Sequence, residues 1–242
     1  MSSREENYRK SDFSGCLFRG MCEDENNPDR CNSLCEVFSE LDYQLQRSGL
    51  PKTCWGKQPL TLGFLDKEVK TKITQILKNV DVYVQEGHNL YLYGEPGCGK
   101  TSWAIKFLNN YFAWVAMNSG GRIPRGRFVN VSSFLRDAKL NISYPDADYK
   151  DCLELIQTCD VVVWDDIGQT QATTYEAQWL YSYINERLQA KLCNVFTSNL
   201  SPEQLAMEDK RLASRICVGA DTLLISGPDM RSNNTFDFSG VS

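Results

Sequence analysis

Glycine, lysine and hydroxyl residues gather in the segment GEPGCGKT, residues 94–101. Glycines let backbone N–H groups turn toward a bound anion, and a helix that begins directly after them adds the positive end of its dipole. Lys100 would reach the β- and γ-phosphates of a nucleotide, and the Thr101 hydroxyl would ligate Mg²⁺. The segment therefore predicts a nucleotide site, in which Cys98 serves as a spacer. The residues expected to line it are Gly94, Glu95, Pro96, Gly97, Cys98, Gly99, Lys100, Thr101 and Ser102.

Two adjacent carboxylates follow a second apolar run in the segment CDVVVWDDIG. They stand where a buried strand would end, which is the sheet edge at which open α/β folds bind ligands. We expect Asp165 to be the carboxylate linked to Mg²⁺ and Asp166 to polarise the water that attacks the γ-phosphate. The alternative is an aspartate pair that caps the following turn.

Asn199 ends another expected strand, in the segment NVFTSNL, and its amide would hold the attacking water opposite Asp166. The alternative is that Asn199 caps the next helix. The start of a helix at this point supports that alternative, because Ser201-Pro202-Glu203-Gln204 has the pattern of a capping box with proline at the first helical position.

Four of the ten cysteines, Cys16, Cys22, Cys31 and Cys35, fall within twenty residues. Cys31 and Cys35 would share one face of a helix. Four thiolates suit a closed tetrahedral Zn²⁺ site, and such a site can order a module that is too small for a core of its own. The alternatives are free cysteines that act as small hydrophobic residues, or an iron–sulfur cluster.

Short β-rich runs alternate with helical stretches after residue 88, which predicts an α/β sandwich around a mostly parallel five-stranded sheet. The expected strands are 89–94, 127–131, 160–164, 194–198 and 222–226. One helix is expected before Gly49 and Pro51, which stop it, and another over residues 66–87. We therefore expect a small Cys-rich module over residues 1–50, a nucleotide-binding domain over 51–231 and a frayed tail over 232–242.

The composition describes an ordinary globular chain of 242 residues, with 42% hydrophobic residues, 24% charged residues and a net charge of −5. The polar beginning and the lack of a long apolar run favour a cytoplasmic protein without a membrane partner. The acidic balance excludes a wholly basic nucleic-acid binder. Contacts with DNA would therefore be local, for example through Arg122, Arg125 and Arg127, although a bare solvated loop fits that segment equally well.

The segments GEPGCGKT, VVVWDDIG, INERL, NVFTSNL and DKRLASRI resemble, in order and approximate spacing, the AAA+ helicase loaders of the DnaC/DnaI type. The IstB transposition ATPases are similar as well. The resemblance covers about residues 50–231. It implies an AAA+ P-loop ATPase with a three-layer sandwich, which binds ATP and Mg²⁺ and assembles with copies of itself.

The resemblance also implies roles for two arginines. Arg215 would be the arginine finger that completes the ATP site of a neighbouring subunit, and Arg231 would be the second sensor arginine. An arginine on a solvated helix face remains the alternative for Arg215. Most ring-type ATPases carry glutamate where Asp166 stands here, and the shorter side chain implies slow hydrolysis.

The activity that the resemblance implies is ATP-dependent loading of a hexameric replicative helicase onto single-stranded DNA, in a bacterial cell or a phage-infected host. The Cys-rich module would grip the helicase. The alternatives are a superfamily-3-like viral helicase, an IstB-like transposition ATPase, a small-molecule kinase, and an adaptor that binds nucleotide without hydrolysing it.

Overall fold

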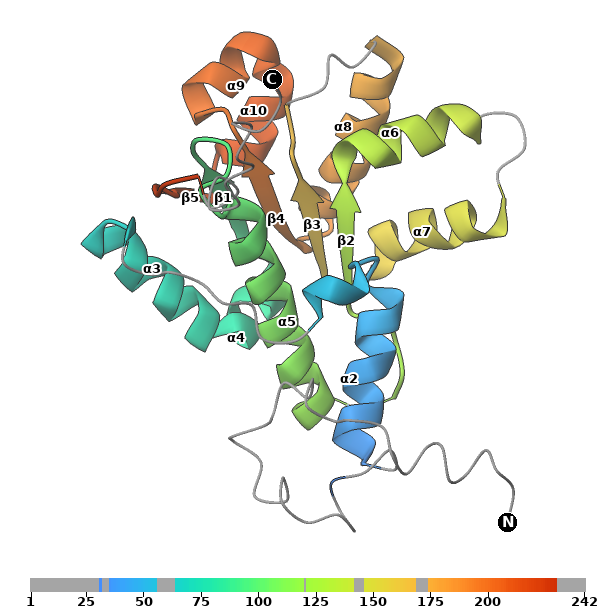
Figure 1. Ribbon diagram of the computed structural model, residues 1–242. Coiled ribbons are helices and arrows are strands. Elements are labelled where there is room, and N and C mark those ends of the chain that lie inside the picture. Colours follow the sequence, from blue (N-terminus) through green and yellow to red (C-terminus); the bar gives the residue numbers. More distant parts are fainter. Residues whose placement is uncertain are drawn as a thin grey trace, which may run out of the picture.

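A five-stranded parallel sheet forms the centre of the molecule (Figure 1). The computed structural model describes Cys31 and residues 35–55, 64–119, 121–141, 146–168 and 174–229. The sheet order is β2-β3-β4-β1-β5, and every neighbouring pair is parallel. The strands are β1 (Asn89–Tyr93), β2 (Gly126–Asn130), β3 (Val161–Asp165), β4 (Cys193–Ser198) and β5 (Asp221–Leu224). The predicted fold class and its five strands are confirmed.

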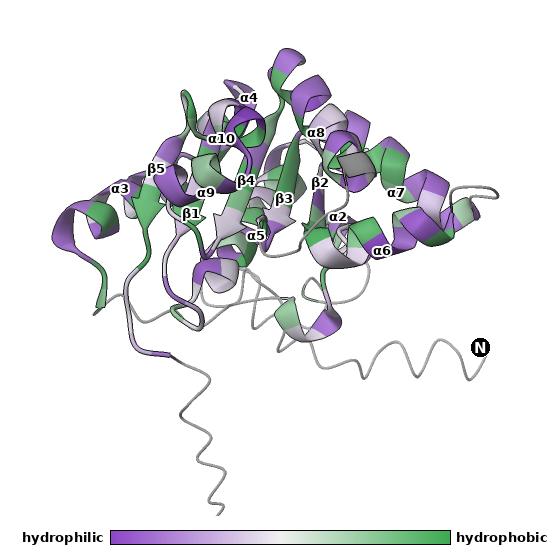
Figure 2. Cartoon of the chain, turned by 90° about the horizontal axis from the view of Figure 1, so that it is seen from above, coloured by the Kyte–Doolittle hydropathy of each residue, from purple (hydrophilic) through white to green (hydrophobic). Residues whose placement is uncertain are grey.

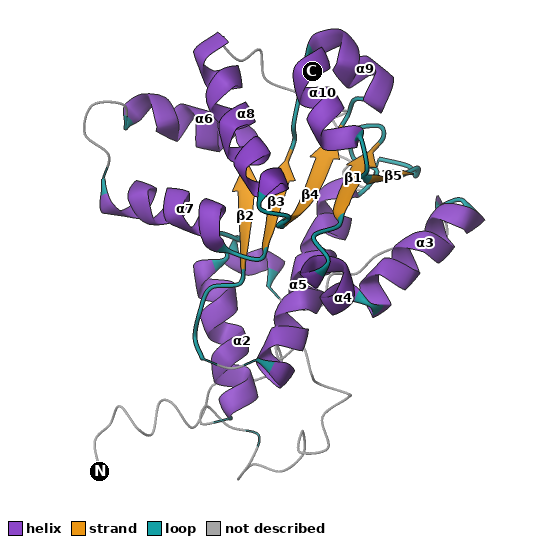
Figure 3. Cartoon of the chain, turned by 180° about the vertical axis from the view of Figure 1, so that it is seen from behind, coloured by secondary structure: helices purple, strands orange, loops and turns teal. Residues whose placement is uncertain are grey.

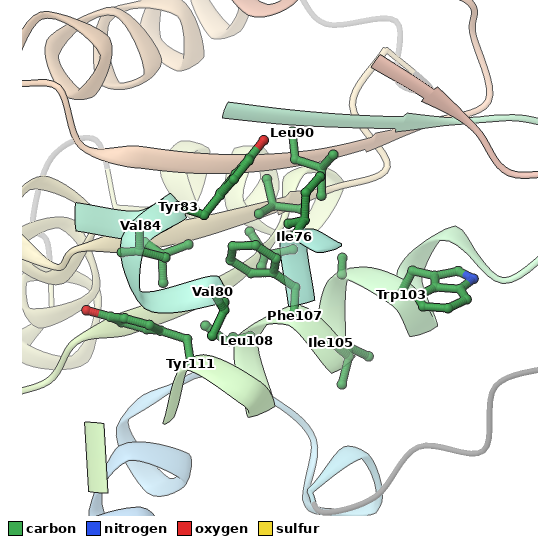
Figure 4. Packing of buried hydrophobic residues seen from close by; sticks show 14 of the residues in the cluster. Ile76, Val80, Tyr83, Val84, Leu90, Trp103, Ile105, Phe107, Leu108 and Tyr111 are labelled. Carbon is green, nitrogen blue, oxygen red and sulfur yellow. The ribbon is translucent and has the colours of Figure 1, made fainter. Parts of the chain in front are cut away.

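Helices cover both faces of this sheet, because alternate strand residues point to opposite sides and nearly all of them are apolar. Leu90, Leu92 and Val195 pack with one helix layer, of which Figure 4 shows a part, and Tyr91, Trp164 and Phe196 pack with the other. The first layer contains α2 (Glu36–Arg47), α3 (Lys67–Lys78), α4 (Val80–Gln85) and α5 (Lys100–Asn118). The second contains α6 (Val131–Leu140), α7 (Ala147–Thr158), α8 (Thr174–Gln189), α9 (Pro202–Glu208) and α10 (Lys210–Cys217).

The central strands are the most deeply buried elements, since every residue of β3 and of β4 is buried. In the view of Figure 2, the strands lie among helices that carry both hydrophobic and hydrophilic residues along their length. None of the helices in the described ranges combines the length and hydropathy that a membrane crossing needs.

The helix expected over residues 66–87 is two helices, so that prediction is wrong. Asn79 separates α3 from α4 with φ −117° and ψ 39°, outside the helical region. Its side-chain amide donates to the Gln75 carbonyl oxygen at 3.0 Å, a local bond of the kind that lets asparagine end helices. Ile73 and Val80 are nevertheless buried on one side, as their spacing predicts.

Helix α2 packs as part of the sheet domain, although the boundary expected near residue 50 assigns it to the Cys-rich module. Its Leu41 and Leu45 belong to the core that contains α5. The buried Gln44 side chain donates to the Ile123 carbonyl oxygen at 2.7 Å and accepts from the Arg125 N–H at 2.8 Å. Helix α2 therefore packs with the sheet, and the domain boundary near residue 50 stays a prediction.

Arg187 of α8 is 1% exposed and ties the second helix layer to the amino ends of β3 and β4 (Figure 3 shows these elements from behind). Apart from the Cys159 sulfur at 4.0 Å, its acceptors are carbonyl oxygens, so its charge is balanced mainly by oriented dipoles. They are Asn194 Oδ1 (2.9 Å) and the backbone oxygens of Ile156 (2.7 Å), Cys159 (2.8 Å), Cys193 (2.7 Å) and Asp160 (3.3 Å). Burial lowers the pKa of the guanidinium, but its ordinary pKa is high enough that it stays charged.

Replacing this arginine tests how much the fold depends on it. Arg187→Met should lower the free energy of unfolding by about 3 kcal/mol or more, because buried carbonyl oxygens lose their donors. Urea unfolding followed by circular dichroism measures the change. The control is Arg136→Met, since Arg136 is an exposed side chain that pairs with Asp137 at 3.5 Å and should contribute less than about 0.5 kcal/mol. Equal midpoints for the two variants would contradict the assigned role of Arg187.

Candidate nucleotide site

The predicted phosphate loop, the aspartate pair and the TSN segment meet at one edge of the sheet. The loop follows β1, and Asp165 ends β3. Thr197 and Ser198 end β4, which lies between β1 and β3. The strands are parallel and in register, with Tyr93 opposite Ser198 and Trp164 opposite Phe196. The carboxyl ends of all three strands therefore present their side chains to the same space.

The glycines of the loop adopt conformations that other residues rarely reach. Gly94, Gly97 and Gly99 have φ values of 148°, 81° and 97°. A Cβ on Gly94 would collide with the Ile225 carbonyl oxygen, and one on Gly97 would collide with the Asp229 carboxylate. The backbone approaches closely here because side chains are missing, which is what a loop that wraps a phosphate needs.

Lys100 begins α5 and is only 5% exposed. Its ammonium donates to the carbonyl oxygens of Gly94 at 3.0 Å and Glu95 at 2.8 Å, so the loop curls around it. Cys98 is buried beside it, with its sulfur 3.8 Å from Nζ. The ammonium group is thus held inside the curve of the loop, where phosphate oxygens of a bound nucleotide can replace the two carbonyl acceptors.

The Asp165 carboxylate links the three segments. Its Oδ1 accepts from the Thr101 hydroxyl at 2.8 Å and from the Thr197 hydroxyl at 2.7 Å. Thr197 Oγ1 in turn accepts from the backbone N–H of Asp166 at 3.0 Å. Thr197 is a functional residue that the sequence motifs did not indicate; the only signal for it is a hydroxyl residue at the buried end of an apolar strand.

The residues at this edge fit a magnesium ion. Thr101 and Asp165 bring a hydroxyl and a carboxylate together, and Mg²⁺ prefers such hard oxygen ligands, completing its shell with phosphate oxygens and water. Within the described ranges no group of three or more His, Cys, Asp or Glu residues is arranged to hold a metal ion. Mg²⁺ in a nucleotide site does not need such a group.

Asp166 directly follows Asp165 at the end of β3, and Asn199 directly follows the end of the neighbouring strand β4. Asp166 is in the left-handed region with φ 61°, which turns the chain sharply after β3. Asn199 is half-buried directly after β4. Ser201, not Asn199, caps α9 through a complete capping box with Gln204. The roles of Asp166 and Asn199 toward water remain predictions.

Arg215 lies on the exposed side of α10, in the helix layer opposite α5. Its Nε donates to the Tyr181 hydroxyl of α8 at 3.1 Å. No hydrogen bond joins its guanidinium to a described residue of the phosphate loop. Arg231, the expected second sensor, lies outside the described residues.

The three arginines near the start of β2 form hydrogen bonds and an ion pair within their own chain. Arg125 pairs with Asp160 at 3.4 Å, and Arg127 donates to the Arg47 carbonyl oxygen at 2.9 Å. Arg122 is exposed and donates to the Ser39 hydroxyl at 2.8 Å. These contacts lie toward the amino ends of the strands, away from the nucleotide edge.

Two of the four clustered cysteines are described. Cys31 and Cys35 are half-buried free thiols at the entrance to α2. The Cys35 thiol does not cap the helix. Cys16 and Cys22 lie outside the described residues, so the zinc site remains a prediction.

Removing one hydroxyl tests the link at Asp165. Thr197→Val keeps the size of the side chain but deletes its donor to Asp165 and its acceptor for the Asp166 N–H. We expect ATP hydrolysis to fall about tenfold and to need more Mg²⁺, while nucleotide affinity stays nearly constant, as for other groups that orient a metal ligand. Titrating activity with Mg²⁺ measures this. Thr222→Val in strand β5 is the control, and an unchanged Mg²⁺ dependence in Thr197→Val would contradict the link.

One protein family and several solved structures are similar to this chain. The family described as IstB-like ATP binding protein matches residues 61–235. No curated protein sequence matches the chain significantly. Among solved structures, the DnaC helicase loader is 19% identical with a TM-score of 0.58, over 73% of this chain and 100% of that chain.

DnaI is 22% identical with a TM-score of 0.56, over 77% of this chain and 98% of that chain. The replication initiator DnaA bound to AMPPCP and single-stranded DNA is 14% identical with a TM-score of 0.53, over 77% of this chain and 50% of that chain. At these identities the structures establish a shared fold. The family match covers most of the chain, including the phosphate loop and the aspartate pair. The chain is an AAA+ P-loop ATPase that belongs to the IstB-like ATP-binding protein family.

Proposed function

We propose that this ATPase loads a replicative DNA helicase onto single-stranded DNA, and that it does so as an oligomer switched by ATP. The likeness to the DnaC helicase loader supports the proposal, because this chain covers the whole length of that structure. The DnaA structure was solved with single-stranded DNA, which supports the choice of nucleic acid.

The observation that carries the proposal is the position of Arg215. It is exposed on α10, in the helix layer opposite the phosphate-loop helix α5. No carboxylate of the described residues lies within ion-pair distance of it. An exposed guanidinium without an internal counter-ion is suited to an anion supplied from outside, and a nucleotide bound to a neighbouring copy is such an anion.

The chemistry at the shared site is hydrolysis of the terminal phosphate. Asp166 orients a water whose oxygen bonds to the γ-phosphorus while the bond to the bridging oxygen breaks. Lys100 and the neighbour's arginine stabilise the charge that builds on the phosphate oxygens. When bound, Mg²⁺ supplies further positive charge at Thr101 and Asp165. The short Asp166 side chain makes the step slow.

The Cys-rich segment is the proposed grip on the helicase. Cys31 and Cys35 have free thiols, and with Cys16 and Cys22 they would provide the four sulfur ligands of a closed Zn²⁺ site. The segment leads directly into α2, which is packed against α5. A partner held by the segment would therefore be connected to the helix that begins at the phosphate loop.

The family match favours a second candidate, an ATPase that assists transposition. It would share the ATP site and the assembly, but its partner would be a transposase. Recovery of a hexameric helicase from a pull-down with the full chain supports loading, whereas recovery of a transposase supports the second candidate.

Mixing two inactive variants tests the trans role of Arg215. Lys100→Ala should lose ATP binding, because the loop loses its cation, and Arg215→Ala should bind ATP but not hydrolyse it. A mixture should regain part of the wild-type turnover, because an intact site then meets an intact arginine. Phosphate release measures turnover, and Lys106→Ala on the same helix α5 is the control for Lys100. Absence of recovery at every mixing ratio would show that Arg215 does not act between chains.

Helicase binding by the Cys-rich segment has a separate test. Cys31→Ser should lower the zinc content from one per chain and abolish co-elution with the helicase, while ATP binding persists because the nucleotide site is remote. Metal analysis and size-exclusion chromatography measure both effects. Cys152→Ser, at a half-buried free cysteine of α7, is the matched control. Wild-type protein that contains no zinc yet binds the helicase would remove the metal site from the proposal.

A further inference from the structure

Tyr181 of α8 brings two arginines of α10 together. Its hydroxyl accepts from Arg215 Nε at 3.1 Å, and the guanidinium of Arg211 lies over its ring, with Cζ 3.8 Å from the ring centroid. The two arginines are one helical turn apart and both are exposed. One tyrosine therefore contacts both guanidiniums, that of Arg215 through its hydroxyl group and that of Arg211 through the face of its ring.

This cluster carries positive charge without an internal balance. Neither arginine lies within ion-pair distance of a carboxylate in the described part of the chain. Two guanidiniums at one ring repel each other, and the tyrosine offsets this with its oxygen lone pair and its π face. The two guanidiniums lower the pKa of Tyr181, and the hydrogen bond from Arg215 has the largest effect. The cluster is therefore suited to bind an anion of another molecule.

The hydrogen bond to Tyr181 also leaves the two terminal nitrogens of the Arg215 guanidinium free. A guanidinium has five N–H donors, and Tyr181 engages the inner one, at Nε. Both terminal nitrogens remain available for a bidentate contact with phosphate. A free arginine on a helix surface samples many rotamers, and fixing it in advance removes that entropic cost from the contact.

We propose that Tyr181 is the positioning residue for Arg215, and that it aims the free fork of the guanidinium at the polyphosphate of a nucleotide bound to a second copy of this chain. The inference rests on the proposed trans role of Arg215. It adds that the arginine is oriented before the two copies meet, by a residue that contacts neither the nucleotide nor the phosphate loop of its own chain.

Tyr181→Phe isolates the hydroxyl, because it deletes the acceptor for Arg215 and keeps the ring beneath Arg211. In the mixture of Lys100→Ala and Arg215→Ala chains, the Lys100→Ala chain supplies Arg215 and the Arg215→Ala chain supplies the intact ATP site. Adding Tyr181→Phe to the Lys100→Ala chain should reduce the recovered kcat about three- to tenfold, as expected for loss of a charge-assisted hydrogen bond at the surface. Adding it to the Arg215→Ala chain should change nothing.

Further readouts separate positioning from a structural role. Tyr181→Phe alone should leave the affinity for a fluorescent ATP analogue and the unfolding temperature unchanged. Tyr183→Phe is the control on the same helix, since its ring packs against Phe134 and Trp179. Equal effects of Tyr181→Phe on both chains of the mixture, or none on either, would overturn the positioning role of Tyr181 but leave the trans role of Arg215 standing. A parent mixture without recovery would overturn the trans role of Arg215 and the inference with it.

Discussion

The carboxylate of Asp165 is the point on which the nucleotide site depends. It is 5% exposed and accepts two hydroxyl hydrogen bonds, from the first turn of α5 and from the end of β4. These bonds fix the phosphate loop relative to the two central strands. They require β3 and β4 to be neighbours in a parallel sheet, and the complete burial of both strands stabilises that arrangement.

The two helix layers divide the chemistry between them. The layer with α5 supplies the loop and the lysine, and the opposite layer carries the exposed arginines of α10. If the arginines serve a neighbour, the contact surfaces of one chain are two different patches. Such head-to-tail contacts build rings or helical filaments, because each added copy offers the same unmatched pair of surfaces.

The fold and the loop were predictable because their signals are local. Continuous apolar runs marked the strands, and the glycine-lysine-hydroxyl spacing marked the turn into α5. The break at Asn79 was missed because a single asparagine interrupts an otherwise continuous helical pattern. The roles of Arg187, Thr197 and Tyr181 were missed because their partners are distant in sequence. The sequence contains one signal for Arg187, because its spacing places it on the buried side of α8 with Leu180 and Ile184.

The strand order has a consequence for the way this chain matures during synthesis. Strand β1 pairs with β4 and β5 in the described sheet, and Asn89 stands opposite Asn194. The phosphate loop therefore leaves the ribosome long before its own strand has a neighbour. Until β4 emerges, the apolar segment NLYLY has two unpaired edges, and such edges attract other chains. A nascent chain cut short before β4 would keep the whole GEPGCGKT segment and still lack an ATP site.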